Sequence, residues 1–362
     1  MKAYSKYENV LEMLRHHVNR CSRMGNLILE GERELCVRFG TSRKTLAKAL
    51  DKLVSEQVLC RERQSTRIVP QNRQIGRYAY VPYFHRESGR LWYYNDQRLW
   101  ESLQLLAMEN FLTIDLVAFD PEYPGETVED LAEKLKSYTM VFLCLFQEEA
   151  FRILAERLRE SKVRMVMMDE NNALPDCSLF AEDCSFSGRI AAETLLKNGY
   201  SHPVMMGSGV SHDNLAIHNR ITAFQKVMKR NGISCPELFF SYRDRLRSVV
   251  ELSSYLSRIR EHGHDCVYFP LDSYLDLITL PLYEQHLVPD VVGIVSTDST
   301  RQASFHNPPV TCTMDCYQEI SHAILDTIRE TERGSAMESP RQIRFKPKLI
   351  PGFSIVNRKE KK

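Results

Sequence analysis

The chain has 362 residues, of which 43% are hydrophobic and 26% charged, and its formal net charge at pH 7 is +1. This length suits two or three domains rather than one core, and the composition is that of an ordinary soluble globular protein. No apolar run reaches the roughly 18 residues of a membrane-spanning helix, and the polar start lacks the apolar segment of a secretory signal, so we expect neither.

The small net charge hides an asymmetry along the chain. Residues 1–73 contain 15 lysines and arginines against 8 aspartates and glutamates, a net of +7, whereas residues 74–362 contain 33 against 39, a net of −6. A basic head on an acidic body predicts an anionic partner for the head alone.

The ten cysteines form no CxxC pair, and several lie inside apolar runs such as "VFLCLF". This distribution predicts a cytoplasmic protein with reduced, buried thiols. A zinc site built from Cys312, Cys316 and a histidine is disfavoured because the spacing fits no metal pattern. We therefore expect no metal and no cofactor.

The basic head reads as three helices and a hairpin. Apolar residues at spacings of three and four predict a helix over residues 4–20, and a second helix opens at Gly31 and closes at Gly40. Thr41 or Ser42 can cap a third helix. The buried stripe expected on that helix consists of Leu46, Ala49, Leu50 and Leu53.

Two short helices joined by a glycine turn, with cations in the first turn of the second, are typical of a helix-turn-helix. Such a helix start brings free N–H groups, the helix dipole and cations toward phosphates and base edges. Residues 58–69 then predict a small hairpin, or wing, with arginines at Arg61, Arg63 and Arg67.

The stretch "LEGERELCVRFGTSRKTLAKALDKLVSEQVLCRERQSTRIV" resembles the winged helix-turn-helix domain of GntR-type bacterial repressors. Glu32-Arg33-Glu34-Leu35, Phe39-Gly40 and Ser42-Arg43 match the family pattern, but Glu30-Gly31 replaces its usual Pro-Ser, and the wing "RQSTR" lacks its glycines. Whether the wing contacts DNA therefore stays open. The DNA-binding residues that the resemblance implies are Arg33, Ser42, Arg43, Lys44, Thr45, Lys48, Arg63 and Arg67.

We assign residues 1–69 to the winged helix-turn-helix head, residues 70–76, which are polar, to a linker, residues 77–357 to the body and residues 358–362 to a basic tail. Across the body, apolar runs alternate with amphipathic helical patterns for more than 200 residues. This alternation predicts an α/β fold with parallel sheets covered on both faces. Ligands of such folds bind beyond the carboxyl ends of the strands.

Several segments of the body, among them "AEDCSFSGRIAAETLLKNGYSHPVMMGS" and "VPDVVGIVSTD", are similar in order and spacing to the effector domain of LacI/GalR-type repressors. The resemblance implies the two-lobed fold of type I periplasmic binding proteins and a homodimer. It also implies a small-molecule effector, such as a carbohydrate, between the lobes. The effector-binding residues that it suggests are Tyr83, Phe84, Asp183, Arg220, Asp272 and Ser296.

Two departures alter this expected site, because Cys184 stands where the family has asparagine, and Val295 and Ser296 replace two aspartates.

The function that the sequence predicts is a ligand-responsive transcription regulator, expected to be a repressor, that binds double-stranded operator DNA and no membrane. The alternative is a metabolic enzyme whose α/β body is tethered by a basic head. The sequence offers no nucleophile–base pair or cofactor fingerprint for it, so we expect no catalytic residues.

Overall fold

The computed structural model describes most of the chain in sixteen segments. These are residues 6–23, 26–56, 58–62, 65–69, 76–82, 94–110, 112–119, 125–144, 148–170, 174–208, 214–240, 245–271, 275–297, 309–314, 316–332 and 339–359. The chain divides into two compact units. The first comprises Met1–Tyr78, Leu103–Asp115 and Ile324–Glu338, and the second Ala79–Ser102, Leu116–Ala323 and Ser339–Lys362.

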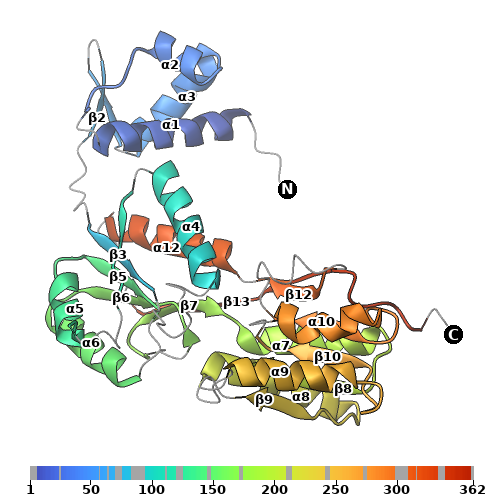
Figure 1. Ribbon diagram of the computed structural model, residues 1–362. Coiled ribbons are helices and arrows are strands. Elements are labelled where there is room, and N and C mark those ends of the chain that lie inside the picture. Colours follow the sequence, from blue (N-terminus) through green and yellow to red (C-terminus); the bar gives the residue numbers. More distant parts are fainter. Residues whose placement is uncertain are drawn as a thin grey trace. The chain divides into compact units, whose positions relative to one another are not determined.

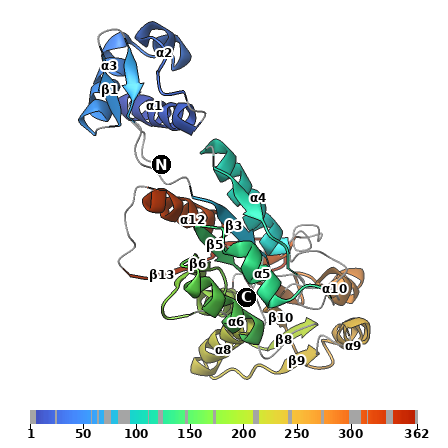
Figure 2. The same cartoon turned by 90° about the vertical axis from the view of Figure 1, so that its left-hand side faces the viewer.

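The head contains α1 (Lys6–Arg23), α2 (Glu32–Arg38), α3 (Arg43–Ser55) and an antiparallel hairpin of β1 (Leu59–Arg61) and β2 (Thr66–Ile68). Figure 2 shows these elements grouped together. The segment before α2 runs beside the hairpin, since the Leu29 amide donates to the Thr66 carbonyl and the Ile68 amide to the Leu27 carbonyl.

The apolar periodicity of α1 and α3 explains why they pack together. One core holds Val10, Leu14 and Val18 of α1, the hairpin's Leu59 and Ile68, and a stripe of α3, all nearly inaccessible to solvent. That stripe is the one expected from the sequence: Leu46, Ala49, Leu50 and Leu53. The winged helix-turn-helix prediction is therefore confirmed.

The first lobe of the body is built on a six-stranded sheet in the order β13-β7-β6-β5-β3-β4 (Figure 1). Its strands are β3 (Tyr78–Val81), β4 (Ile114–Leu116), β5 (Met140–Leu143), β6 (Arg164–Met167), β7 (Ser178–Glu182) and β13 (Gln342–Phe345). The pairs β5–β6, β6–β7 and β7–β13 are parallel. Alternate strand residues pack against α5 (Val128–Leu135) and α6 (Glu148–Glu160) in one core.

The second lobe holds another six-stranded sheet, ordered β14-β12-β11-β10-β8-β9. Its strands are β8 (Pro203–Ser208), β9 (Glu237–Phe240), β10 (Cys266–Phe269), β11 (Gly293–Ser296), β12 (Thr311–Met314) and β14 (Lys348–Ile350). One face packs against α7 (Cys184–Lys197) and α8 (Leu215–Arg230), and the other against α9 (Arg245–Ser257) and α10 (Leu275–Glu284). Successive side chains of β10 point to opposite faces of the sheet. Tyr268 therefore packs in the core with α7 and α8, and Phe269 packs in the core with α9 and α10.

In the second sheet, the pairs β8–β9, β8–β10, β10–β11 and β11–β12 are parallel, whereas β14 pairs antiparallel with β12. The chain crosses between the lobes three times: from β7 into α7, from β12 through α12 (Tyr317–Glu332) into β13, and from β13 into β14. Strands β7, β12 and β13 lack a long apolar run, and they were not predicted as strands from the sequence. The expected α/β fold with a two-lobed body is otherwise confirmed.

Helix α4 (Tyr94–Glu109) precedes β4. Asn110, the residue after α4, accepts a hydrogen bond from Arg329 of α12 over 2.5 Å.

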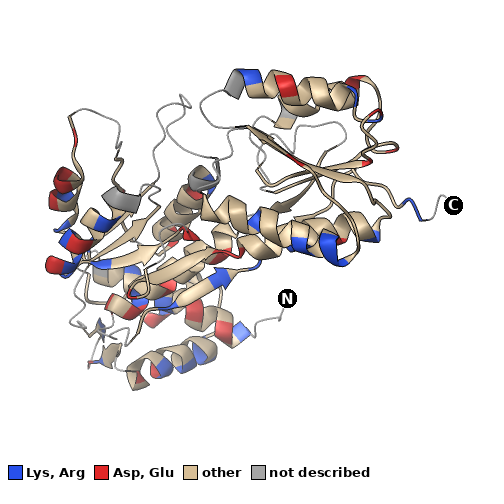
Figure 3. Cartoon of the chain, turned by 90° about the horizontal axis from the view of Figure 1, so that it is seen from below, with Lys and Arg blue, Asp and Glu red and all other residues tan. Residues whose placement is uncertain are grey.

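Lysines, arginines, aspartates and glutamates are spread along the helices of the chain (Figure 3). In the part of the chain that is described, no helix combines the length and the apolar character needed to cross a bilayer.

Candidate DNA interface and candidate ligand cleft

The start of α3 is fixed by two local features of the sequence. Gly40 has a φ of +56°, a left-handed conformation that glycine adopts without strain, and it turns the chain after α2. Ser42 then caps α3, because its Oγ accepts a hydrogen bond from the Thr45 amide over 3.3 Å. The helix therefore begins at Arg43 and directs its first free amides outward.

The first turn of α3 is cationic and exposed. Arg43 and Lys44 lie on the surface, no acidic residue occurs in that turn, and neither side chain forms an ion pair with a described residue. Arg33 of α2 is likewise exposed. Positive charge, free amides and the helix dipole coincide here, which makes this surface suited to an anion such as a phosphate.

Other cations of the head take part in contacts within the domain. Lys48 lies over the ring of Tyr7, with its Nζ 4.6 Å from the ring centroid. Arg61 pairs with Asp51 at 2.9 Å and with Glu32 at 3.5 Å, so it joins the wing to α3 and α2.

The two other arginines expected on the wing are Arg63 and Arg67. Arg67 of β2 pairs with Glu62 at 3.6 Å and stays half exposed. Arg63 lies outside the described residues. Arg33, Arg43 and Lys44 thus lie exposed on α2 and at the start of α3, whereas the described wing arginines, Arg61 and Arg67, are exposed but paired with acidic residues.

In the body, Arg220 of α8 is buried rather than open to solvent. Its Nη2 lies 3.4 Å from Oε1 of Glu182, at the end of β7, and its Nη1 donates to the carbonyl oxygen of Pro270 over 3.1 Å. Glu182 also accepts a hydrogen bond from Ser187 of α7. A guanidinium of the second lobe is thereby bound to a carboxylate of the first.

A second contact also joins α8 of the second lobe to the first lobe. Glu170, which follows β6 and is buried, accepts from Asn219 of α8 over 2.9 Å and from Arg344 of β13 over 2.6 Å. Glu170 and Glu182 both lie at the carboxyl ends of first-lobe strands. Neighbouring residues of α8, Asn219 and Arg220, therefore each hold one carboxylate at the lobe crossing.

The backbone at this crossing is closely packed. A Cβ atom at Gly188 of α7 would lie 1.9 Å from the backbone oxygen of Arg220, so only glycine allows α7 and α8 to approach this closely. The register of α8 against α7, and with it the position of Arg220, is set by this contact.

Two more predicted effector residues lie nearby but have structural partners. Asp183 caps α7 through a hydrogen bond from the Phe186 amide over 2.9 Å. Ser296 ends β11, beside Phe269 of β10, and its buried hydroxyl donates to the Thr297 carbonyl. Burial raises the pKa of Cys184, the first residue of α7, well above its ordinary value, so its thiol is neutral.

Three predicted effector residues, Tyr83, Phe84 and Asp272, lie outside the described residues. The structure therefore brings Asp183, Arg220 and Ser296 to the carboxyl-end region of the strands, where ligands of such folds bind. Sequence reasoning missed Glu170, Glu182, Asn219 and Arg344. No periodic signal marks them, because their roles depend on partners from 38 to 174 positions away in the chain.

Residues 6–69 match the family model described as bacterial regulatory proteins of the gntR family. The head carries a gntR-family domain. The match spans the three helices and the wing, so the surface of Arg33, Arg43 and Lys44 belongs to this gntR-type domain. No curated protein sequence matches the chain.

Solved structures resemble the rest of the chain. A LacI family transcriptional regulator from Enterococcus faecium with bound ribose superposes with a TM-score of 0.61 at 12% identity, covering 78% of this chain and 99% of that one. A periplasmic binding protein/LacI transcriptional regulator from Alkaliphilus metalliredigens, complexed with D-xylulofuranose, gives 0.60 at 14% identity, with 76% and 98% covered. At such identities the likeness establishes the fold of the body.

A lac repressor dimer bound to operator and the anti-inducer ONPF is also similar, with a TM-score of 0.61 at 11% identity, covering 79% of this chain and 95% of that one. The gntR-type head is thus joined to a body with the fold seen in LacI-family regulators. The sequence-based expectation of this combination is confirmed.

Proposed function

We propose that this protein is a transcription regulator whose gntR-type head binds double-stranded operator DNA and whose body binds a small metabolite between its lobes. The observation that carries the proposal is the start of α3. Exposed Arg43 and Lys44, the free amides after Ser42 and the helix dipole act there at one point.

In the proposed complex, the first turn of α3 enters the major groove, as the second helix of a helix-turn-helix does. Arg43 reads a base edge, and phosphates are bound by Arg33, Lys44 and Lys48. Ser42 and Thr45 fix the helix start and can reach the backbone with their hydroxyls. Arg63 and Arg67 contact DNA from the wing in this proposal, in a geometry that its glycine-free tip must allow.

We infer a carbohydrate or related metabolite as the effector, supported by the ribose and D-xylulofuranose in similar structures. Its site in this chain consists of Tyr83, Phe84, Asp183, Arg220, Asp272 and Ser296. Arg220 offers a planar donor fork for hydroxyls or a carboxylate. A ligand that uses it competes with Glu182, which links binding to the contact between lobes.

A homodimer is the assembly that fits a repressor with a twofold-symmetric operator. The outer face of α4 supports it, because Leu105 and Met108, one helical turn apart, are 63% and 70% exposed. Large exposed apolar patches mark association surfaces, and in this proposal Leu105 and Met108 are part of one. We also propose a domain boundary near residue 69, a linker over residues 70–76, a body over residues 77–357, a basic tail over residues 358–362 and a place in the cytoplasm, where operator DNA lies.

The test is an electrophoretic retardation assay of the full chain with DNA from its own promoter region, with and without pentoses and hexoses. We expect a specific complex whose affinity changes when the effector is present. A thermal-shift screen with the same sugars identifies the effector, because a ligand of the folded state stabilises it. If no promoter fragment is retarded even at low salt, the proposal is wrong. The enzyme alternative has no support in the comparisons or in the described residues.

A further inference from the structure

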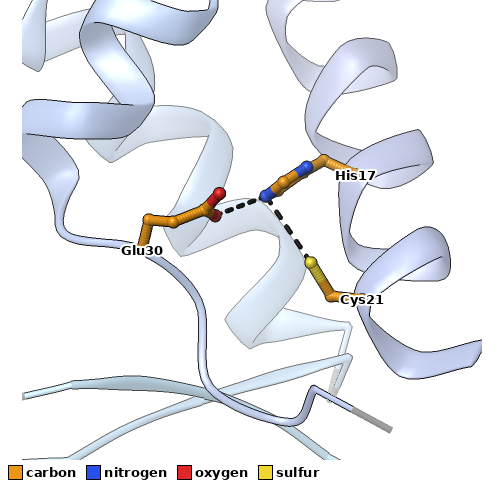
Figure 4. A group of neighbouring side chains, drawn as sticks. All are labelled: His17, Cys21 and Glu30. Carbon is orange, nitrogen blue, oxygen red and sulfur yellow. Dashed lines mark hydrogen bonds and ion pairs between the residues drawn. The ribbon is translucent and has the colours of Figure 1, made fainter. Parts of the chain in front are cut away.

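Three side chains of the head converge at a place that the proposed function does not use. His17 and Cys21 lie one turn apart on α1, and Glu30 lies on the extended segment before α2 (Figure 4). Nε2 of His17 is 2.5 Å from Oε2 of Glu30 and 3.6 Å from Sγ of Cys21. Among the described residues, this is the group of three potential metal ligands whose atoms all lie within 4.8 Å of one another.

The surroundings orient these side chains before any ion arrives. His17 is 8% exposed, and its ring lies nearly perpendicular to the ring of Phe39 at a centroid distance of 5.7 Å. Arg38 binds Oε1 of Glu30 at 2.8 Å, which leaves Oε2 directed at His17. An outer partner that fixes a carboxylate in this way is a regular feature of metal sites.

The spacing fits the ligand geometry of zinc. With metal–ligand distances of about 2.0–2.3 Å and tetrahedral angles, two ligand atoms lie about 3.5 Å apart. The separation between His17 and Cys21 already has this value. The Glu30 carboxylate must move away from His17 by about 1 Å, and only its own side chain has to rotate.

We propose that His17, Cys21 and Glu30 bind one zinc ion, with water as the fourth ligand. An imidazole, a thiolate and a carboxylate favour zinc over calcium or magnesium, which prefer oxygen ligands alone. As the zinc–sulfur bond forms, the Cys21 thiol releases its proton to solvent. His17 binds through Nε2 as the neutral imidazole, and any proton shared between His17 and Glu30 is also released to solvent.

The ion ties α1 to the segment that leads into α2. Without it, the Cys21 thiol makes one long contact here, 3.6 Å from Nε2 of His17. The segment already contacts α1 through the His17–Glu30 pair, the hydrogen bond from the Asn26 amide to the Cys21 carbonyl and the packing of Leu29. The ion adds three bonds that join the two elements. Zinc therefore stabilises the head, and it does so independently of whether the head binds DNA.

The experiment uses the reduced, metal-free full-length chain. Cobalt is titrated first, because a thiolate-to-cobalt charge-transfer band reports a cysteine ligand, and zinc then displaces it. We expect one cobalt per chain with this band. Cys21→Ser should abolish the band and weaken zinc binding by more than about 100-fold, beyond the loss typical of an outer-shell change. Cys60→Ser, which removes the exposed thiol of the wing, is the matched control and should change neither.

A spectroscopic measurement on the wild type alone does not depend on any variant folding. X-ray absorption of the zinc-loaded wild-type protein should show one sulfur with nitrogen and oxygen ligands. Zinc should also raise the unfolding temperature of the wild type and of Cys60→Ser, but not of Cys21→Ser. A zinc shell with two or more sulfurs, a cobalt band that survives Cys21→Ser, or the absence of any thiolate band would overturn the proposal.

Discussion

The hydroxyl of Ser42 accepts a hydrogen bond from the amide of Thr45, and this bond determines where α3 begins. The first amides of a helix have no carbonyl partner within the helix, and the Ser42 hydroxyl provides an acceptor for one of them. Because the same end of the helix carries the cations proposed to meet DNA, the cap has both a structural and a functional consequence, and these can be separated by mutation.

Ser42→Ala should lower the stability of α3 by about 0.5–2 kcal/mol through loss of the cap, whereas Ser42→Asp keeps a capping oxygen. Ser42→Asp should nevertheless weaken DNA binding, because its charge faces the phosphates. Native-state hydrogen exchange of the α3 amides measures the first effect, and a retardation assay the second. Equal DNA affinity for Ser42→Asp and the wild type would show that this end of α3 does not contact DNA.

Arg43→Ala should reduce operator affinity by about 1–3 kcal/mol and relax base preference at one position, if Arg43 reads a base edge. Lys52→Ala is the matched control. It removes the same charge from the last turn of α3, where Lys52 pairs with Glu56 at 3.4 Å in an exposed contact. Binding measured against a set of point-mutated operators distinguishes the two. A loss that is identical for Arg43→Ala and Lys52→Ala would show that only total charge matters.

The elements of the head were predictable because local chemistry determines them. The stripe of α3 follows from apolar spacing, and the turn at Gly40 follows from the need for a left-handed residue. The pairing of Arg220 with Glu182 was not predictable, since it brings together residues of different lobes. Sequence analysis identified Arg220 from its family position but not its partner.

The same limit applies to the strands and to the zinc candidate. In β13, exposed and half-buried residues alternate, and its register beside β7 is set by the sheet rather than by its own composition. The spacing of His17 and Cys21, four residues apart on one helix, was a readable signal for two metal ligands. Glu30 was not, because its approach depends on how the segment before α2 packs.

Gly31→Ser should stabilise α2 by about 0.5–1 kcal/mol. Gly31 is the N-cap residue with φ of −57° and no side-chain cap, and an added Cβ would meet no atom within 4 Å. The substitution also completes a capping-box sequence with Glu34, three residues later. Hydrogen exchange of the α2 amides measures the gain. Gly40→Ser is the contrasting control, since its φ of +56° makes any side chain unfavourable there.

Glu56→Gln should destabilise the head at neutral pH but not in acid. Although burial opposes it, the hydrogen bonds and charges of Arg15 and Lys52 lower the pKa of Glu56 below its ordinary value of 4.5. A lowered folded-state pKa gives stability that is present above the unfolded value and lost as the pH falls through the folded one.

Both Arg15 and Glu56 are partly exposed, at 41% and 27%, so solvent screening limits the contribution to about 0.2–1 kcal/mol. Hydrogen exchange of wild type and variant should thus differ at pH 7 and converge as the pH falls through the folded-state pKa of Glu56, which lies below 4.5. A difference that grew toward low pH would contradict the assigned sign.

Arg220→Met should destabilise the body by about 3–5 kcal/mol, because it leaves the carboxylate of Glu182, which is 10% exposed, without its cation. The double variant Arg220→Met/Glu182→Gln should recover much of this loss, since it removes both charges together. Denaturant unfolding of the wild type, both single variants and the double variant gives the coupling energy between the two residues. Additive losses would mean that Arg220 stabilises the lobe crossing through the Pro270 carbonyl and packing, and that Glu182 is not its essential partner.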